Sequence, residues 1–166
     1  MGLLDLLVER LQGALQRPQA ARSWRCRCGA PIFFANSRCL ACGAELGFVP
    51  ETLSLQALPG PGPGAGHGSP ALQRCAHHAT IGCNWMLPVR EVSAQGGLCR
   101  ACRLTRTVPD LSFEDNRRAW AAIESAKRRL VMQLLALGLP VRSRLSEDPA
   151  RGLMFDFLRP LDDAPV

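Results

Sequence analysis

Cys26–Gly43 reads CRCGAPIFFANSRCLACG, in which two closely spaced pairs of cysteines are separated by ten residues. Zn²⁺ binds four soft ligands in a tetrahedron, and two cysteines on one tight turn supply two of these ligands. Gly29 and Gly43 follow the two pairs, where a residue that accepts positive φ lets the chain curl around a metal. Pro31–Phe34 and the residues after it fit a short strand and a turn. We predict one Zn²⁺ site formed by Cys26, Cys28, Cys39 and Cys42.

A second set of four cysteines follows later in the chain and is spaced less regularly. Cys99 and Cys102 have the standard turn spacing, whereas seven residues separate Cys75 from Cys83. His77 and His78 lie in that interval, so the imidazole of either one is an alternative ligand in place of Cys75. A complete set of four thiolates exists without them, and we expect the second Zn²⁺ site to consist of Cys75, Cys83, Cys99 and Cys102.

The amino-terminal residues indicate the compartment of the protein, which decides whether the eight cysteines form disulfides or bind metal. Met1–Arg10 has no basic leading segment, and Asp5 and Glu9 interrupt the stretch that a signal peptide would keep apolar. We therefore expect a cytoplasmic protein, in which disulfides do not persist and clustered thiols bind metal. A thioredoxin-like redox pair needs a βαβ setting that neither cluster shows, and a catalytic zinc site keeps open the position that a fourth thiolate fills. The cysteines thus predict two structural Zn²⁺ ions.

The formal net charge of +6 is compatible with an acidic partner such as a nucleic acid. Each set of four thiolates around Zn²⁺ adds about −2, which leaves roughly +2 for the zinc-loaded chain. No segment is apolar enough to cross a bilayer, so we expect no membrane span. Six arginines near the cysteines either contact nucleic acid or form a solvated face that offsets the thiolate charge. They are Arg25, Arg27, Arg38, Arg100, Arg103 and Arg106.

Composition divides the chain into six segments. Residues 1–22 hold a predicted amphipathic helix and its lead-in, and residues 59–72 form a Pro/Gly-rich linker that cannot sustain a helix or a central strand. The other segments are a zinc ribbon at 23–58, a zinc-ribbon-like module at 73–111, an amphipathic helix at 112–139 and a partly ordered carboxyl-terminal segment at 140–166. The expected fold class is small α+β, with short β-hairpins on two four-cysteine zinc sites and one long helix.

The long helix is predicted to run from Ser112 to about Leu137. Ser112 and Asp115 resemble a capping box, and Gly138 suits the end of the helix. The apolar face that we expect in the core comprises Trp120, Ile123, Leu130, Val131, Leu134 and Leu137. The face that we expect in solvent carries Arg117, Arg118, Arg128 and Arg129. Lys127 falls among the apolar residues, where its stem packs and its ammonium reaches water, so we assign it no function.

The sequence contains no recognisable catalytic motif. An HExxH helix would supply two zinc-binding imidazoles and a general base, but none of the three histidines is followed by Glu or by a second His at the required distance. A phosphate-binding GxxxxGK loop and a GxSxG elbow are also absent. These 166 residues are therefore not predicted to be an enzyme.

Several stretches resemble a bacterial family of zinc metallopeptidases with amino-terminal zinc-ribbon motifs. The resemblance covers Cys26–Pro50, Cys83–Trp85, Cys99–Leu111, Asn116–Leu139 and Asp148–Leu158, and leaves out the leading helix and the Pro/Gly linker. It implies that the eight cysteines are the family's zinc ligands and that longer members continue into a peptidase-like domain with an HExxH helix. The catalytic His and Glu have no counterpart here, so peptidase activity is not carried over. The chain is then either a truncated member or part of a longer protein.

Together these observations predict a non-catalytic recognition module that accompanies a metallopeptidase domain in longer relatives and positions a substrate or a protein partner. A nucleic-acid-binding zinc-ribbon protein and a free-standing protein–protein adaptor are the alternatives. A structural zinc site contributes on the order of 10–16 kcal/mol in small peptides, which equals or exceeds the whole stability of a small domain. Loss of the metal is therefore expected to unfold both modules.

Overall fold

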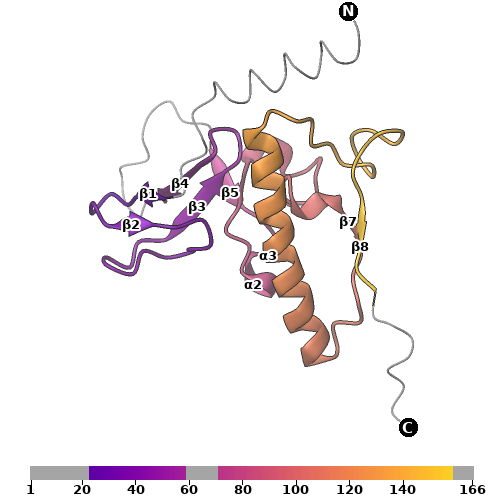
Figure 1. Cartoon of the computed structure of the whole chain (residues 1–166), viewed down its shortest axis with the longest axis horizontal. Coiled ribbons are helices and arrows are strands. Elements are labelled where there is room, and N and C mark those ends of the chain that lie inside the picture. Colours follow the sequence, from indigo (N-terminus) through magenta and orange to yellow (C-terminus); the bar gives the residue numbers. More distant parts are fainter. Residues whose placement is uncertain (1–22, 59–70, 159–166) are drawn as a thin grey trace, which may run out of the picture.

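The computed structural model describes residues 23–58 and 71–158, and these residues form the small α+β fold that the sequence predicts (Figure 1). The helix predicted within residues 1–22, nearly all of the predicted linker and residues 159–166 lie outside the described residues.

The first module consists of two β-hairpins. β1 (Trp24–Arg25) pairs antiparallel with β2 (Pro31–Ile32), and β3 (Leu46–Val49) pairs antiparallel with β4 (Ser54–Ala57). All four residues of β3 are buried, because this strand also lies against the second module. β3 therefore joins the two parts of the fold.

The second module begins with β5 (Leu72–Arg74), which pairs antiparallel with β6 (Met86–Pro88). The single-turn helix α2 (His78–Ile81) lies between these strands, and Gly82 ends it in a left-handed conformation with φ of 63°. Two 3-10 helices follow in the second module. They are η1 (Val89–Glu91) and η2 (Cys102–Leu104).

The two modules share one hydrophobic core. Phe48 of β3 bridges to Trp85, and both side chains are fully buried with their ring centroids 4.8 Å apart. The backbone N–H of Phe48 donates to the Asn84 carbonyl at 2.8 Å, and the Asn84 amide donates to the carbonyls of Phe34 and Asn36 at 2.7 and 3.0 Å. The side chain of Asn84 thus completes the hydrogen bonds of a loop that belongs to the other module.

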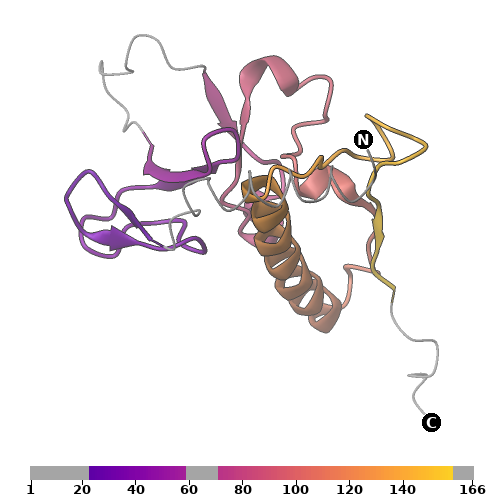
Figure 2. The ribbon, with the colours of Figure 1, turned by 45° about the horizontal axis from the view of Figure 1, so that its top comes forward.

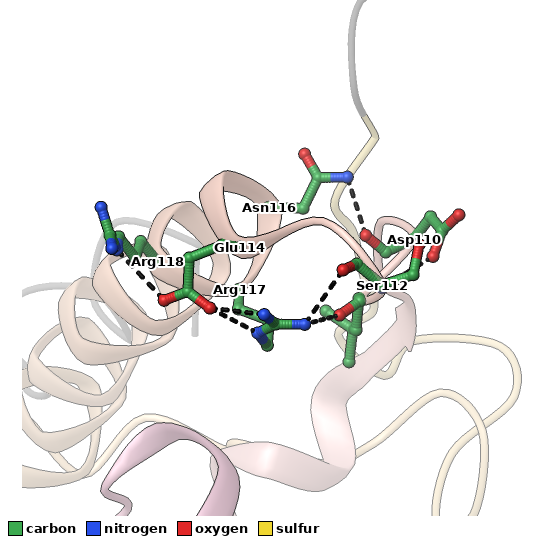
Figure 3. A network of polar contacts seen from close by, with 7 residues as sticks. Asp110, Ser112, Glu114, Asn116, Arg117 and Arg118 are labelled. Carbon is green, nitrogen blue, oxygen red and sulfur yellow. Dashed lines mark hydrogen bonds and ion pairs between the residues drawn. The ribbon is translucent and has the colours of Figure 1, made fainter.

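The long helix α3 spans Glu114–Ala136, and Gly138 follows its C-cap with φ of 71°, the left-handed conformation that was predicted there. The predicted capping box is wrong, because Phe113 occupies the N-cap and makes no side-chain cap. Instead, the Ser112 backbone N–H donates to the Asp110 carboxylate, and the Arg117 guanidinium donates to the Leu111 and Ser112 carbonyls (Figure 3). The Arg117 guanidinium, one turn into α3, therefore fixes the residues that immediately precede the helix.

The buried face of α3 differs from the predicted one. Ile123, Leu130 and Leu137, expected in the core, are 43, 43 and 51% exposed, whereas Lys127 and Arg128, both expected to reach solvent, are 4 and 6% exposed. The face that packs on the second module carries polar side chains in addition to Trp120 and Val131. These polar residues are Asn116, Glu124, Lys127 and Arg128. Ile123 and Leu130 are expected in the core because a helical wheel groups apolar residues on one face. It does not show which polar side chains of the helix find partners in the rest of the fold.

The segment after α3 returns along the second module. β7 (Thr105–Thr107) pairs in parallel with β8 (Phe155–Asp156). The buried Arg103 guanidinium forms ion pairs with Glu147 at 2.8 Å and with Glu91 at 3.7 Å. Figures 1 and 2 show the hairpins of the first module and the β7–β8 pair on opposite sides of α3.

Candidate metal centres

The first cluster lies in the first module. Cys26 and Cys28 lie between β1 and β2, and Cys39 and Cys42 lie between the bridged residues Arg38 and Glu45. The Cys26 and Cys42 sulfurs are 3.7 Å apart, as are those of Cys28 and Cys39, and all four lie within 4.8 Å of one another. A tetrahedron with Zn–S bonds of about 2.3 Å has sulfurs about 3.8 Å apart, so these distances fit one zinc ion. Cys26 and Cys39 are buried, whereas Cys28 and Cys42 are exposed.

Two glycines shape the turns that carry these cysteines. Gly29 and Gly43 adopt φ of 85° and 72°, and their backbone N–H groups donate to the Cys26 and Cys39 carbonyls, each at 2.8 Å. Most side chains disfavour this left-handed conformation. The positive φ predicted at both glycines is confirmed.

The second cluster is formed entirely by buried side chains. The Cys83 sulfur is 3.8 Å from that of Cys99 and 3.7 Å from that of Cys102, and Cys75 completes a group of sulfurs within 4.8 Å of one another. The Cys99 backbone N–H donates to the Cys75 sulfur at 3.4 Å. The distances fit a second tetrahedral zinc ion.

The irregular spacing of the second cluster has a structural explanation. α2 fills the interval between Cys75 and Cys83, and Gly82 then reverses the chain so that Cys83 points back to Cys75. The histidines of this interval are not in the cluster. The His78 ring nitrogen lies 2.9 Å from the Cys83 carbonyl oxygen, and the His77 ring packs edge-on against Trp120 with centroids 5.3 Å apart. The geometry therefore supports Cys75, and not an imidazole, as the fourth group.

Hydrogen bonding divides charge unequally among the metal-free sulfurs of the first cluster. The Cys42 backbone N–H lowers the pKa of Cys39 to about 6. The Ala44 backbone N–H acts to lower the pKa of Cys42. The hydrogen bond between the Cys42 and Cys28 thiols and the desolvation of Cys42 outweigh it and raise the pKa of Cys42 to about 11. Metal binding to this cluster therefore displaces protons.

The second cluster shows the same division of charge. Hydrogen bonds from Cys102, Cys83 and Cys99 lower the pKa of Cys75 well below its usual range. Burial raises the pKa of Cys99, and the hydrogen bond with Cys75 raises the pKa of Cys102. One sulfur thus takes the negative charge and its neighbours donate to it, which is the arrangement that a bound cation would replace.

Two residues that the sequence reasoning missed lie beside the second cluster. The Glu124 Oε2 atom is 3.9 Å from the Cys102 sulfur, and the Glu124 Oε1 atom accepts hydrogen bonds from Thr105 and Lys127, both at 2.6 Å. Their position on the same helix face as Trp120 and Val131 was the available signal, because a charged pair three residues apart on a buried face needs a polar neighbour. The sequence analysis places Lys127 on this face without a function and does not place Glu124 there.

Within residues 23–58 and 71–158, no other group of histidine, cysteine or acidic side chains is arranged to hold a metal ion. In the same residues, no helix combines the length and apolar character needed to cross a membrane.

Comparison with known proteins agrees with these centres. The sequence model of a zinc-ribbon domain family matches residues 23–113, which is more than half of the chain. A second family, described as "Putative zinc-binding metallo-peptidase", matches residues 116–166. Both matches and the two clusters support the prediction of two zinc ions.

Proteins from Mycobacterium bovis and from two strains of Mycobacterium tuberculosis, all described as uncharacterized, are 35% identical to the chain over 138 residues. This alignment covers 82% of the chain but only 37% of each relative, so the chain spans little more than a third of their length. No solved structure matches.

Proposed function

We propose that this chain, which belongs to the zinc-ribbon domain family, is a non-catalytic module that uses zinc to hold in place the first helix of a metallopeptidase-like region. The boundary between the two family matches carries the proposal. The zinc-ribbon match ends at residue 113 and the peptidase match begins at residue 116, whereas α3 starts at Glu114. The helix that opens the second match is thus built against the second zinc site, through Trp120 and Glu124.

The proposal assigns all eight cysteines as ligands, four to each Zn²⁺. Four thiolates complete the coordination of zinc and leave no position for a water molecule, which a hydrolytic zinc site requires. The sequence contains no HExxH helix to supply such a site elsewhere. The two ions therefore act on stability and on the position of α3, while catalysis in longer relatives falls to residues outside the region aligned with this chain.

The test compares one ligand from each site. Hydrogen exchange of the α3 amides is measured in the zinc-loaded chain and in Cys83→Ser and Cys28→Ser variants. Cys83→Ser should expose the α3 amides because the surface beneath the helix is lost, whereas the matched Cys28→Ser change should leave most of their protection intact. Full protection of α3 in Cys83→Ser would contradict the proposed role.

The exposed side of α3 gives the module a surface for a partner. Apolar residues recur there at spacings of four, three and four, the pattern of a helix seam, and two of them, Ala126 and Leu130, line a cavity of about 370 Å³. The seam consists of Ala119, Ile123, Ala126 and Leu130. Because the metallopeptidase match begins on this same helix and the relatives are much longer, we assign the seam to the remainder of that region.

A chimera tests this assignment. The chain is joined to the segment that follows the aligned region in the Mycobacterium tuberculosis relative, and Ile123 and Leu130 are both changed to Asp. The double change should lower the melting temperature of the chimera and leave that of the isolated chain nearly unchanged. Equal effects on both proteins, or no effect on either, would exclude the seam as the contact surface.

The nucleic-acid alternative is weakened by where the arginines lie. Arg103 is buried in ion pairs with Glu91 and Glu147, and Arg106 forms two hydrogen bonds with Asp156. Arg25 also donates to the Gly29 carbonyl at 3.0 Å, so three of the six candidate arginines make contacts within the fold. Binding of short DNA or RNA whose affinity falls steeply with salt would restore this alternative.

A further inference from the structure

Glu124 and Lys127 form an ion pair in the interior of the fold. Their side chains are 0 and 2% exposed, and the Lys127 ammonium donates to the Glu124 carboxylate at 2.6 Å. Removing two charges from water costs several kcal/mol for each ion, and their mutual attraction often fails to repay that cost. A pair in this position therefore needs an explanation beyond the stability of α3.

The orientation of the Glu124 carboxylate points to the metal centre. Its Oε1 atom accepts hydrogen bonds from both Thr105 and Lys127, so its Oε2 atom is left facing the Cys102 sulfur at 3.9 Å. In the metal-free cluster the Cys102 thiol can donate to this oxygen. Once Cys102 is a zinc-bound thiolate it has no proton to donate, and two negative groups then lie side by side in the interior.

A charge count shows what the site must offset. Zn²⁺ with four thiolates carries about −2, and the Glu124 carboxylate brings the buried total to about −3. Lys127 is the cation in direct contact with the Glu124 carboxylate. Its ammonium also lies 5.6 and 5.5 Å from the ring centroids of Phe155 and Phe157, so aromatic rings close its other side. The Lys127 ammonium is thus kept out of water and held against the Glu124 carboxylate, whose other oxygen faces the Cys102 sulfur.

We propose that the Lys127 ammonium compensates the negative charge of the second zinc site. Glu124 is the positioning residue, because one of its carboxylate oxygens holds the ammonium and the other faces the Cys102 sulfur. The inference rests on the proposed function in one respect, since it requires zinc at Cys75, Cys83, Cys99 and Cys102. Without Lys127, the Glu124 carboxylate would face the thiolates uncompensated and weaken the binding of that ion.

A double-mutant cycle in the full zinc-loaded chain tests the proposal. Zinc release to a competing chelator is followed for Lys127→Met, Glu124→Gln and the double variant, with Arg129→Met as the control that removes an exposed cation from the same helix. Lys127→Met should weaken one of the two zinc ions at least tenfold and leave the other unchanged. The double variant should return to within about threefold of the parent, and the control should match the parent.

A spectroscopic measurement separates charge compensation from simple anchoring of the helix. With Co²⁺ in place of zinc, the sulfur-to-metal charge-transfer band reports the energy of the sulfur lone pairs, which nearby negative charge raises. Lys127→Met should therefore move the band of the second site to longer wavelength, and Glu124→Gln should move it to shorter wavelength. An anchoring role alone would lower the melting temperature without moving the band.

The possible outcomes are distinct. Equal weakening of both ions, a double variant no better than Lys127→Met, or unmoved charge-transfer bands would overturn the inference. If Lys127→Met yields no folded protein, Glu124→Gln decides alone, because it should retain the second zinc at least as tightly as the parent, and weaker retention would refute the proposal. A parent chain that holds fewer than two zinc ions would instead overturn the proposed function.

Discussion

The two four-cysteine clusters use the same ligand chemistry in different surroundings. In the first cluster the cysteines come in closely spaced pairs on glycine-ended turns, and two of its four sulfur-bearing residues are exposed. In the second cluster the spacing is irregular, all four are buried, and α3 lies alongside with Glu124 near Cys102. The cluster that is easier to recognise in the sequence is therefore the less protected one.

The difference separates local from long-range determinants of a metal site. Short spacing and glycine place two sulfurs from a few residues of backbone, so they appear directly in the sequence. Burial of the cysteines depends on segments that are distant in the sequence, as where Glu124 of α3 lies against Cys102. The first site is thus set mostly by its own turns, and the second by the whole fold.

Among substitutions that leave all eight cysteines in place, the largest predicted effect comes from breaking the contact that joins the two modules. Trp85 is fully buried and packs on Phe48 of the first module. Trp85→Ala should destabilise the zinc-loaded chain by about 3–5 kcal/mol, because it removes a large buried side chain and leaves a cavity. Chemical denaturation measures the change, with Phe33→Ala at a 55% exposed aromatic residue as the control. Equal losses in the two variants would show that the modules do not depend on their shared core.

A second prediction sharpens the comparison through zinc exchange. The first site should exchange its ion at least tenfold faster than the second, because Cys28 and Cys42 are open to solvent and the second site can exchange only after the core opens. Incorporation of a zinc isotope, followed by mass spectrometry of the intact protein, resolves the two rates. A single common rate would mean that burial does not distinguish the sites.

The smallest predicted effect lies at the edge of the second module. Arg106 and Thr107 lower the pKa of the Asp156 carboxyl, so this contact stabilises the fold above the usual Asp range and loses that effect as pH falls through the lowered pKa. Asp156→Asn should slightly lower the melting temperature near neutral pH and make no difference in strong acid. A penalty that persists in acid would assign the effect to lost hydrogen bonds instead of charge.

Much of this fold was predictable because its signals are local. The fold class, the positive φ at Gly29 and Gly43 and the end of α3 at Gly138 agree with expectation. The parallel pairing of β7 with β8 was not predicted, because it joins Thr105 to Phe155, fifty residues apart, and no periodic pattern records such a contact.

The buried charges on α3 show the second limit. Arg128 is expected in solvent, and Lys127 is expected to bury only its stem, because charged side chains are rarely buried without a partner. Glu124, the partner of Lys127, lies three residues before it in the sequence, but the packing of their shared face on the second module is visible only in the fold. The apolar Ile123 and Leu130 were placed in the core by the same pattern, yet they are among the more exposed residues of the helix. Residue type alone does not say which face of a helix meets the rest of the fold.

The most direct test of the account is the zinc content of the folded chain and the consequence of its removal. Protein purified under reducing conditions should contain two zinc ions per chain by elemental analysis, and a strong chelator should abolish its cooperative thermal transition. A well-folded chain without zinc, or one that keeps the same transition after verified removal of both ions, would contradict the claim that zinc holds this fold together.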